Sequence, residues 1–180
     1  MSVEAAARTR SETWDAIVLR VLKQNKVSLI AYVPDKVLAP LIKSLHADDF
    51  FTVLSPAREE EAAGIVAGAY MAGQRGIVLM QTSGFATLPN VIASMAVPYQ
   101  IPLLMMISER GTLGDFQFGQ AMVCRTMRPV LESLAIEHYA ITRLDEVEFI
   151  VDSMIKQAFS TQAPAAMILS PLLTKHSAKK

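Results

Sequence analysis

Cysteine is almost absent from this chain of 180 residues, which contains only Cys124. A single cysteine excludes an internal disulfide bond and any zinc site built from cysteines, and it is typical of a reducing cytosol. The histidines do not supply other ligands, because His46, His138 and His176 never occur at the spacing of metal ligands. We therefore expect a cytoplasmic protein in which this chain holds no metal ion by itself.

An excess of either charge is also missing, because 17 lysines and arginines stand against 17 aspartates and glutamates. No net field therefore draws the chain toward nucleic acid or an anionic membrane. No uninterrupted apolar run reaches the roughly 18 residues of a membrane span, and the polar N-terminus MSVEAAARTRSETW is unlike a signal peptide. We expect no nucleic-acid partner and no membrane partner.

What the chain does have is apolar surface, since 52% of its residues are hydrophobic and only 19% are charged. Such a composition excludes a disordered chain and indicates that some surface is hidden against a partner. The length fits one domain over residues 1–180, with a core at about 11–172. We expect the tail, residues 173–180, to be solvated and flexible.

Short apolar runs alternate with amphipathic ones along the whole chain. The runs that read as strands are apolar on both faces, as in a parallel sheet: 27–33, 50–54, 76–81, 101–108, 138–142 and 165–170. The helical stretches are 11–25, 36–46, 59–73, 86–98, 117–135 and 145–162. This alternation predicts an α/β fold of three layers, α/β/α, with a mostly parallel six-stranded sheet and right-handed crossovers.

Ligands of such folds bind beyond the carboxyl ends of the strands. Four segments are expected there: VPDK (33–36), PAREEE (56–61), TSGFATLPN (82–90) and SERGTLGDFQFGQ (108–120). The turn at 82–90 contains neither a Walker lysine nor G-x-G-x-x-G, so it is a weak phosphate motif. Ser83 lacks the preceding glycine of a nucleophile elbow, so the evidence for a hydrolase is equally weak.

Glu59, Glu60 and Glu61 open the helix 59–73, where the helix dipole favours acids by about 0.3 to 1 kcal/mol each. The remainder of this helix is small and apolar all round, as in a buried helix. Successive residues lie about 100° apart, so the three side chains cannot all point to water. At least one is expected to point inward or across an interface. Gly64 and Gly68 suggest close packing of another backbone or a flat ligand, since each costs about 1 kcal/mol of helix propensity.

Several segments together resemble one family. They are VPDKVLAPLI (33–42), REEEAAGIVAGAYMAGQRGIVLMQTSG (58–84), PNVIASM (89–95) and IPLLMMISERG (101–111). This combination resembles the pyrimidine-binding domain of thiamine-diphosphate enzymes, in particular the alpha subunits of sulfopyruvate decarboxylase and the phosphonopyruvate decarboxylases. The likeness covers most of residues 25–170 and implies a thiamine-diphosphate-dependent 2-oxo acid decarboxylase.

The resemblance also implies a partner subunit. Enzymes of this family hold Mg²⁺ and the diphosphate with a G-D-G…N motif, whereas the only Gly-Asp of this chain, at 114–115, leads into Phe116. The expected partner is therefore a pyrophosphate-domain subunit that carries this motif, in a heterotetramer or larger assembly that alone is active. A non-catalytic regulatory or scaffolding paralogue is the alternative.

In this family a glutamate after the second strand hydrogen-bonds N1′ of the cofactor's aminopyrimidine and promotes loss of the C2 proton. The spacing from Arg58 and to Gly73 selects Glu59 for this catalytic role, whereas alignment on Tyr70 selects Glu60. Glu61 is left as an acid that favours the helix terminus.

The resemblance assigns further contacts. Those expected to pack against the pyrimidine are Thr82, Ser83, Gly84 and Phe85, although Ala86 and Thr87 replace the Gly-Asn more common in the family. Gln117 matches a family glutamine on the substrate side. Arg110 is expected to bind the distal acid group of a small 2-oxo acid, sulfopyruvate first, with Arg125 and Arg128 as other cations. An apolar 2-oxo acid is the alternative substrate, because Phe116, Phe118 and Met122 lie in the same segment.

Overall fold

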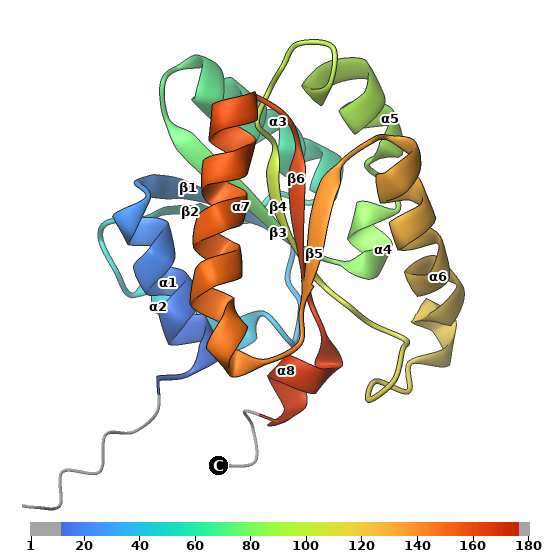
Figure 1. Ribbon diagram of the computed structural model, residues 1–180. Coiled ribbons are helices and arrows are strands. Elements are labelled where there is room, and N and C mark those ends of the chain that lie inside the picture. Colours follow the sequence, from blue (N-terminus) through green and yellow to red (C-terminus); the bar gives the residue numbers. More distant parts are fainter. Residues whose placement is uncertain (1–11, 177–180) are drawn as a thin grey trace, which may run out of the picture.

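The computed structural model describes residues 12–176, which form one α/β unit around a six-stranded sheet with the strand order β2-β1-β3-β4-β6-β5 (Figure 1). All strand pairs are parallel. The strands are β1 Val27–Tyr32, β2 Thr52–Leu54, β3 Arg75–Gln81, β4 Leu104–Ser108, β5 Glu137–Ile141 and β6 Ala165–Leu169. The main helices are α1 Trp14–Gln24, α2 Ala39–His46, α3 Glu59–Met71, α6 Phe118–Ser133 and α7 Val147–Thr161.

Helices cover both faces of the sheet, so the predicted three-layer α/β/α fold is confirmed. One hydrophobic cluster joins the sheet to α1, α2 and α7, and a second joins the opposite face to α3 and α6. Successive strand residues alternate between the clusters, with Leu104 and Met106 in the first and Met105 and Ile107 in the second. This burial on both faces is the reason why the strands read as continuous apolar runs.

The strand order places β1 beside β3, although β2 lies between them in the chain. The chain thus continues to one side of β1 and then returns to the other, which creates a topological switch point at the carboxyl edge. The segments that follow β1, β3 and β4 meet at this edge, at the bottom of Figure 1, where α8 (Pro171–His176) follows β6. The fold therefore brings the predicted functional segments together.

The connection from β3 to β4 differs from the single helix predicted over 86–98. It contains α4 (Thr82–Phe85), α5 (Pro89–Val91) and a π-helical turn, η1 (Ile92–Ala96). Pro89 lacks the N–H that a continuous helix needs, and therefore a new helix starts there. The following turn is widened by the hydrogen bond from the Val97 N–H to the Ile92 carbonyl, at 2.9 Å.

The tail is a second difference from the sequence analysis, which expects a solvated chain from residue 173. Residues 171–176 instead form α8, and Leu173 is buried with 2% of its surface exposed. This leucine packs into the cluster that contains α1 and α7, which explains why the chain stays ordered past β6. Residues 177–180 lie outside the described part. Between residues 12 and 176, no helix is long and apolar enough to cross a membrane.

Candidate active site

The three glutamates at the start of α3 have different surroundings. Glu60 accepts hydrogen bonds from Arg58 at 3.1 and 3.4 Å, and this contact lowers the pKa of Glu60. The Glu61 carboxylate accepts the backbone N–H of Ala57 at 3.0 Å and so ties the segment before α3 to the first turn of the helix. Each carboxylate thus has a partner close to it in the sequence, and the side chain of Thr87 also lowers the pKa of Glu60.

Glu59 instead lies against α4. A Cβ atom built on Gly84 would be 2.1 Å from Oε1 of Glu59 and 2.5 Å from its Cδ. The carboxylate thus rests directly on the backbone of Gly84, and the side chain is half-buried. One glutamate of the three points inward, as the sequence predicts, and the structure brings Glu59 together with the predicted cofactor-binding segment 82–85.

Within this segment, three residues are buried and only Ser83 is partly exposed. The buried Thr82 donates its hydroxyl to the Ser108 carbonyl at 3.1 Å and accepts the Arg110 N–H at 3.0 Å. Phe85 is 1% exposed and belongs to the hydrophobic core. Ser83 is partly exposed, and its hydroxyl has no hydrogen-bond partner in the described chain. The Gly84 carbonyl accepts the hydroxyl and the backbone N–H of Thr87, at 2.9 and 3.1 Å, so the Ser83 hydroxyl is the group of this segment that remains for a ligand.

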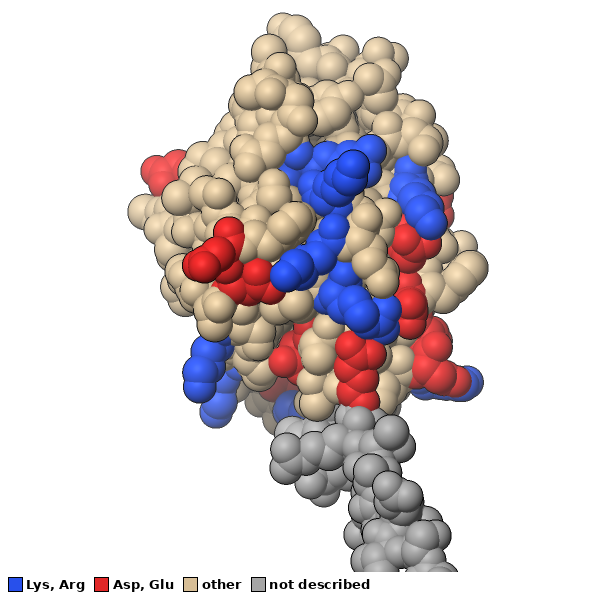
Figure 2. Space-filling view, turned by 90° about the vertical axis from the view of Figure 1, so that its left-hand side faces the viewer, with Lys and Arg blue, Asp and Glu red and all other residues tan. Residues whose placement is uncertain are grey.

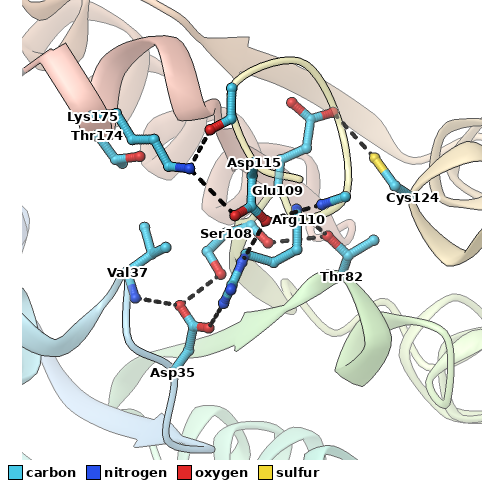
Figure 3. A network of polar contacts seen from close by, with 12 residues as sticks. Asp35, Val37, Thr82, Ser108, Glu109, Arg110, Asp115, Cys124, Thr174 and Lys175 are labelled. Atoms are coloured by element: carbon cyan, nitrogen blue, oxygen red, sulfur yellow. Dashed lines mark hydrogen bonds and ion pairs between the residues drawn. The ribbon is translucent and has the colours of Figure 1, made fainter. Parts of the chain in front are cut away.

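A buried acid, Asp35, organises the centre of the carboxyl edge (Figure 3). One of its oxygens, Oδ1, accepts the backbone N–H of Val37 at 2.9 Å and the hydroxyl of Ser108 at 2.9 Å. The other oxygen, Oδ2, lies 2.7 Å from Nη1 of Arg110. From the sequence, Asp35 is predicted only as part of the segment 33–36, and an acid two residues after the apolar run 27–33 is the signal that could have singled it out.

Arg110, the predicted anion-binding residue, lies between two carboxylates. Its Nη1 pairs with Asp35, and its Nε lies 2.9 Å from Asp115, which also accepts the Gly111 N–H at 3.0 Å. Burial alone would lower the pKa of Arg110, but the hydrogen bond that Arg110 donates to Asp115 and the charge of Asp35 raise it. Lys175 of α8 reaches the same Asp115 at 3.4 Å. The charge of Arg110 is thus offset within this chain.

Gln117 lies between two cavities. The first, of about 570 Å³, follows the segment between β4 and α6, and its lining includes Phe116, Gln117, Phe118, Cys124, Arg125 and Arg128. The second, of about 500 Å³, is lined by residues that include Trp14, Lys36, Arg110, Gln117 and Lys175. Phe116 and Phe118 are 92% and 94% exposed. Arg110 and the cluster of exposed aromatic residues therefore line different cavities.

A second buried acid, Glu109, follows β4 and was predicted only as part of the segment 108–120. Its Oε1 lies 2.5 Å from Nη1 of Arg128 and 3.8 Å from Sγ of Cys124. Burial and the charge of Glu109 raise the pKa of the Cys124 thiol. Of the predicted alternative cations, Arg128 is thereby paired, whereas Arg125 has no ion-pair partner in the described part of the chain.

No three histidine, cysteine, aspartate or glutamate side chains gather into a metal-binding group within residues 12–176. Nε2 of His46 lies 3.1 Å from the Tyr32 hydroxyl, and Nδ1 of His138 lies 2.9 Å from the Ile136 carbonyl. The side chain of His176 lies outside the described part. Figure 2 shows basic and acidic side chains interspersed on one face, in keeping with the balanced charge of the chain.

Residues 12–117 match the family described as "Thiamine pyrophosphate enzyme, N-terminal TPP binding domain". The chain belongs to this family. The match includes α3 and α4, where Glu59 meets Gly84, and the segment through Arg110. The resemblance inferred from the sequence is thereby confirmed.

Individual relatives agree with this result. The chain is 31% identical to sulfopyruvate decarboxylase subunit alpha of Methanocaldococcus jannaschii over 163 residues, which is 91% of this chain and 96% of the relative. It is 27% identical to sulfopyruvate decarboxylase of Methanosarcina acetivorans, over 86% of this chain and 39% of the relative. It is also 34% identical to phosphonopyruvate decarboxylase of Streptomyces viridochromogenes, over 49% of this chain and 22% of that protein.

A solved structure shows the same fold. The 2-oxoglutarate:ferredoxin oxidoreductase from Magnetococcus marinus superposes with a TM-score of 0.71 over 90% of this chain and 29% of that chain. The sequences are 15% identical, so this likeness concerns the fold alone.

Proposed function

We propose that the chain is the pyrimidine-binding subunit of a thiamine-diphosphate-dependent 2-oxo acid decarboxylase, and that Glu59 is its catalytic acid. The observation that carries the proposal is the position of the Glu59 carboxylate on the backbone of Gly84, at the carboxyl edge of the sheet. Glu60 is paired with Arg58, and Glu61 accepts the backbone N–H of Ala57, whereas the contact with Gly84 is made by Glu59.

The residues at this edge fit the pyrimidine end of the cofactor. A carboxylate that is partly removed from water can hold or release a proton at a ring nitrogen, and Glu59 supplies such a group. Ser83 adds a hydroxyl that the rest of the described chain leaves free. When bound, thiamine diphosphate supplies the electron sink that accepts the electron pair released as carbon dioxide leaves the 2-oxo acid. Mg²⁺ and the diphosphate are assigned to the partner subunit.

The names of the relatives support this partner. Subunit alpha of M. jannaschii matches this chain along nearly its whole length, whereas the M. acetivorans decarboxylase has additional chain beyond the matched 39%. The surface of this chain also supports a partner, because Arg75 is the only charged residue from Ala62 to Ser108. Within that span several residues are nevertheless exposed, among them Gly64, Gly68, Met71, Val97 and Tyr99. An uncharged exposed surface of this kind favours association.

The substrate proposed is a small 2-oxo acid with a distal acid group, sulfopyruvate first. A second anion needs a cation to offset its desolvation. Arg110 would have to exchange an existing carboxylate partner, Asp35 or Asp115, for the substrate. Arg125 lines the cavity of about 570 Å³ and has no ion-pair partner within residues 12–176, so it is the better placed cation. An apolar 2-oxo acid, favoured by the exposed Phe116 and Phe118, is the competing candidate.

Reconstitution tests the proposal. The chain is co-expressed with a partner that carries the G-D-G…N motif, and carbon dioxide release from sulfopyruvate is measured with Mg²⁺ and thiamine diphosphate. We expect activity only from the complex, and a loss of about 10² to 10⁴ in kcat for Glu59→Gln. A complex that forms but retains full turnover in Glu59→Gln contradicts the catalytic assignment.

A further inference from the structure

We propose that Gly84 is a positioning residue, whose missing side chain determines where the Glu59 carboxylate lies. The inference rests on the proposed function, because it assumes that Glu59 is the catalytic acid. It gives Gly84 a role different from direct contact with the cofactor: Gly84 acts through Glu59.

The contact involves the whole end of the glutamate side chain. A Cβ atom on Gly84 would be 2.1 Å from Oε1, 2.5 Å from Cδ and 2.6 Å from Cγ of Glu59. Carbon atoms in van der Waals contact are about 3.5 to 4.0 Å apart. A single methyl group at position 84 would therefore displace the carboxylate by about 1 Å or more.

The backbone gives no other reason for glycine at this position. Gly84 lies within α4, and the glycines with positive φ in the described chain are Gly73, Gly111 and Gly114. Alanine has a helix propensity that is more favourable than that of glycine by about 1 kcal/mol in a helix interior. The backbone conformation at position 84 thus does not require glycine. The three atoms nearest to an added Cβ all belong to Glu59, so the space that this side chain occupies is the reason for glycine here.

The surroundings determine whether a methyl group at position 84 would displace the backbone of α4 or the side chain of Glu59. The backbone of α4 is anchored by the Thr82 hydroxyl, which bonds to both Ser108 and Arg110, and by the buried Phe85. Glu59, by contrast, is the first residue of α3 and has a flexible, half-buried side chain. Gly84→Ala therefore leaves the fold intact and moves the carboxylate. A misplacement of about 1 Å can lower a rate by about 10².

A double-mutant cycle in the reconstituted complex separates this role from direct cofactor contact. The variants are Gly84→Ala, Glu59→Gln and the double variant, with kcat, KM and the dissociation constant of thiamine diphosphate measured for each. We expect Gly84→Ala to lower kcat by about 10² and the double variant to be no slower than Glu59→Gln. Losses that multiply would overturn the proposal, because Gly84 would then act independently of Glu59.

Gly119→Ala is the matched control, since a Cβ there has no heavy atom within 4 Å. A measurement on the full chain without cofactor adds a direct readout: in chain labelled with ¹³C at the glutamate carboxyls, the Glu59 resonance should shift in Gly84→Ala and not in Gly119→Ala. An unshifted resonance in Gly84→Ala overturns the positioning role.

The outcomes also distinguish this inference from the proposed function. If Glu59→Gln keeps its turnover, the proposed function of Glu59 fails, whatever the carboxyl resonance shows. If Glu59→Gln is inactive while Gly84→Ala keeps its turnover, the positioning role fails and the proposed function stands.

Discussion

Arg110 and Asp35 form an ion pair of 2.7 Å that joins the segment after β4 to the segment after β1. These strands are not neighbours, since β3 lies between them in the sheet. The pair is nearly buried, with 13% of the arginine side chain and 2% of the aspartate side chain exposed. Arg110 thus links segments across the switch point, and its charge is already compensated before any substrate binds.

This arrangement predicts different effects for two arginines. We expect Arg125→Gln to lower kcat/KM for sulfopyruvate by about 10-fold or more while kcat/KM for pyruvate, which has no distal acid group, changes little. Arg110→Gln should instead lower the free energy of unfolding of the full chain by about 3 to 5 kcal/mol, because it leaves the buried carboxylate of Asp35 without its cation. Competition between the two substrates and thermal unfolding measure these effects. Equal losses for both substrates in Arg125→Gln would contradict the assignment of the cation.

The buried acid Asp115 predicts a pH dependence of stability. Hydrogen bonds from Arg110 and Gly111 outweigh the effect of burial and lower the pKa of Asp115 below its ordinary value of 3.8. A carboxyl with a lowered pKa in the folded state stabilises the fold at pH above 3.8, and this contribution is lost as the pH falls below that value. Asp115→Asn should therefore cost about 1.5 to 3 kcal/mol at pH 7.

The difference between Asp115→Asn and the parent should shrink in unfolding experiments below pH 3.8, the ordinary value for this carboxyl. Asp49→Asn is the control, since Asp49 is exposed and has no ion-pair partner in the described chain. Its effect should stay within about 0.5 kcal/mol. A cost for Asp115→Asn that persists unchanged into acid would mean that the charge of Asp115 is not what stabilises the fold.

The turn after Arg110 predicts a loss of stability at Gly111. Its φ of +75° belongs to the left-handed region, and a Cβ there would lie 2.5 Å from the backbone carbon of Gln120. Backbone atoms cannot swing aside, so Gly111→Ala should destabilise the chain by about 1 to 3 kcal/mol. Gly119→Ala, which meets no atom, should not destabilise it. Denaturant unfolding of both variants makes the comparison, and equal midpoints would refute it.

The proposed division of the site between two chains predicts that this chain alone neither decarboxylates 2-oxo acids nor binds thiamine diphosphate tightly. The reason is that this chain has no Gly-Asp-Gly, the motif expected to hold the magnesium ion that accompanies the diphosphate, since its Gly-Asp at 114–115 leads into Phe116. Titration calorimetry with Mg²⁺ and the cofactor, with and without the partner, measures this. Tight magnesium-dependent binding by the purified single chain would be inconsistent with a divided site.

The sequence predicts the fold well, because strands buried on both faces leave a clear apolar signature and because their carboxyl ends must meet at one edge. It also contains the signal for the break in the helix over 86–98, since Pro89 is visible in the sequence. The short helix α8 is harder to predict from the sequence. Leu173 reads as part of a polar tail, and only the position of α1 and α7 reveals that a core surrounds it.

The site is predicted in part. The sequence correctly predicts that these segments meet at one edge of the sheet, but the choice between Glu59 and Glu60 depends on where α4 lies relative to α3, which no spacing along the chain specifies. The pairing of Arg110 is likewise invisible in the sequence, because Asp35 lies 75 positions away. Charged residues on neighbouring loops can bind a ligand or each other, and only the folded geometry distinguishes these cases.

The most direct test of the central claim is the rate at which the C2 proton of bound thiamine diphosphate exchanges with deuterium in the reconstituted complex. We expect exchange to slow by about 10² to 10⁴ in Glu59→Gln and to remain at the parental rate in Glu60→Gln. Glu60→Gln is the matched control, since it is the same substitution on the neighbouring residue. Parental exchange in Glu59→Gln together with slow exchange in Glu60→Gln would contradict the account and move the catalytic role to Glu60.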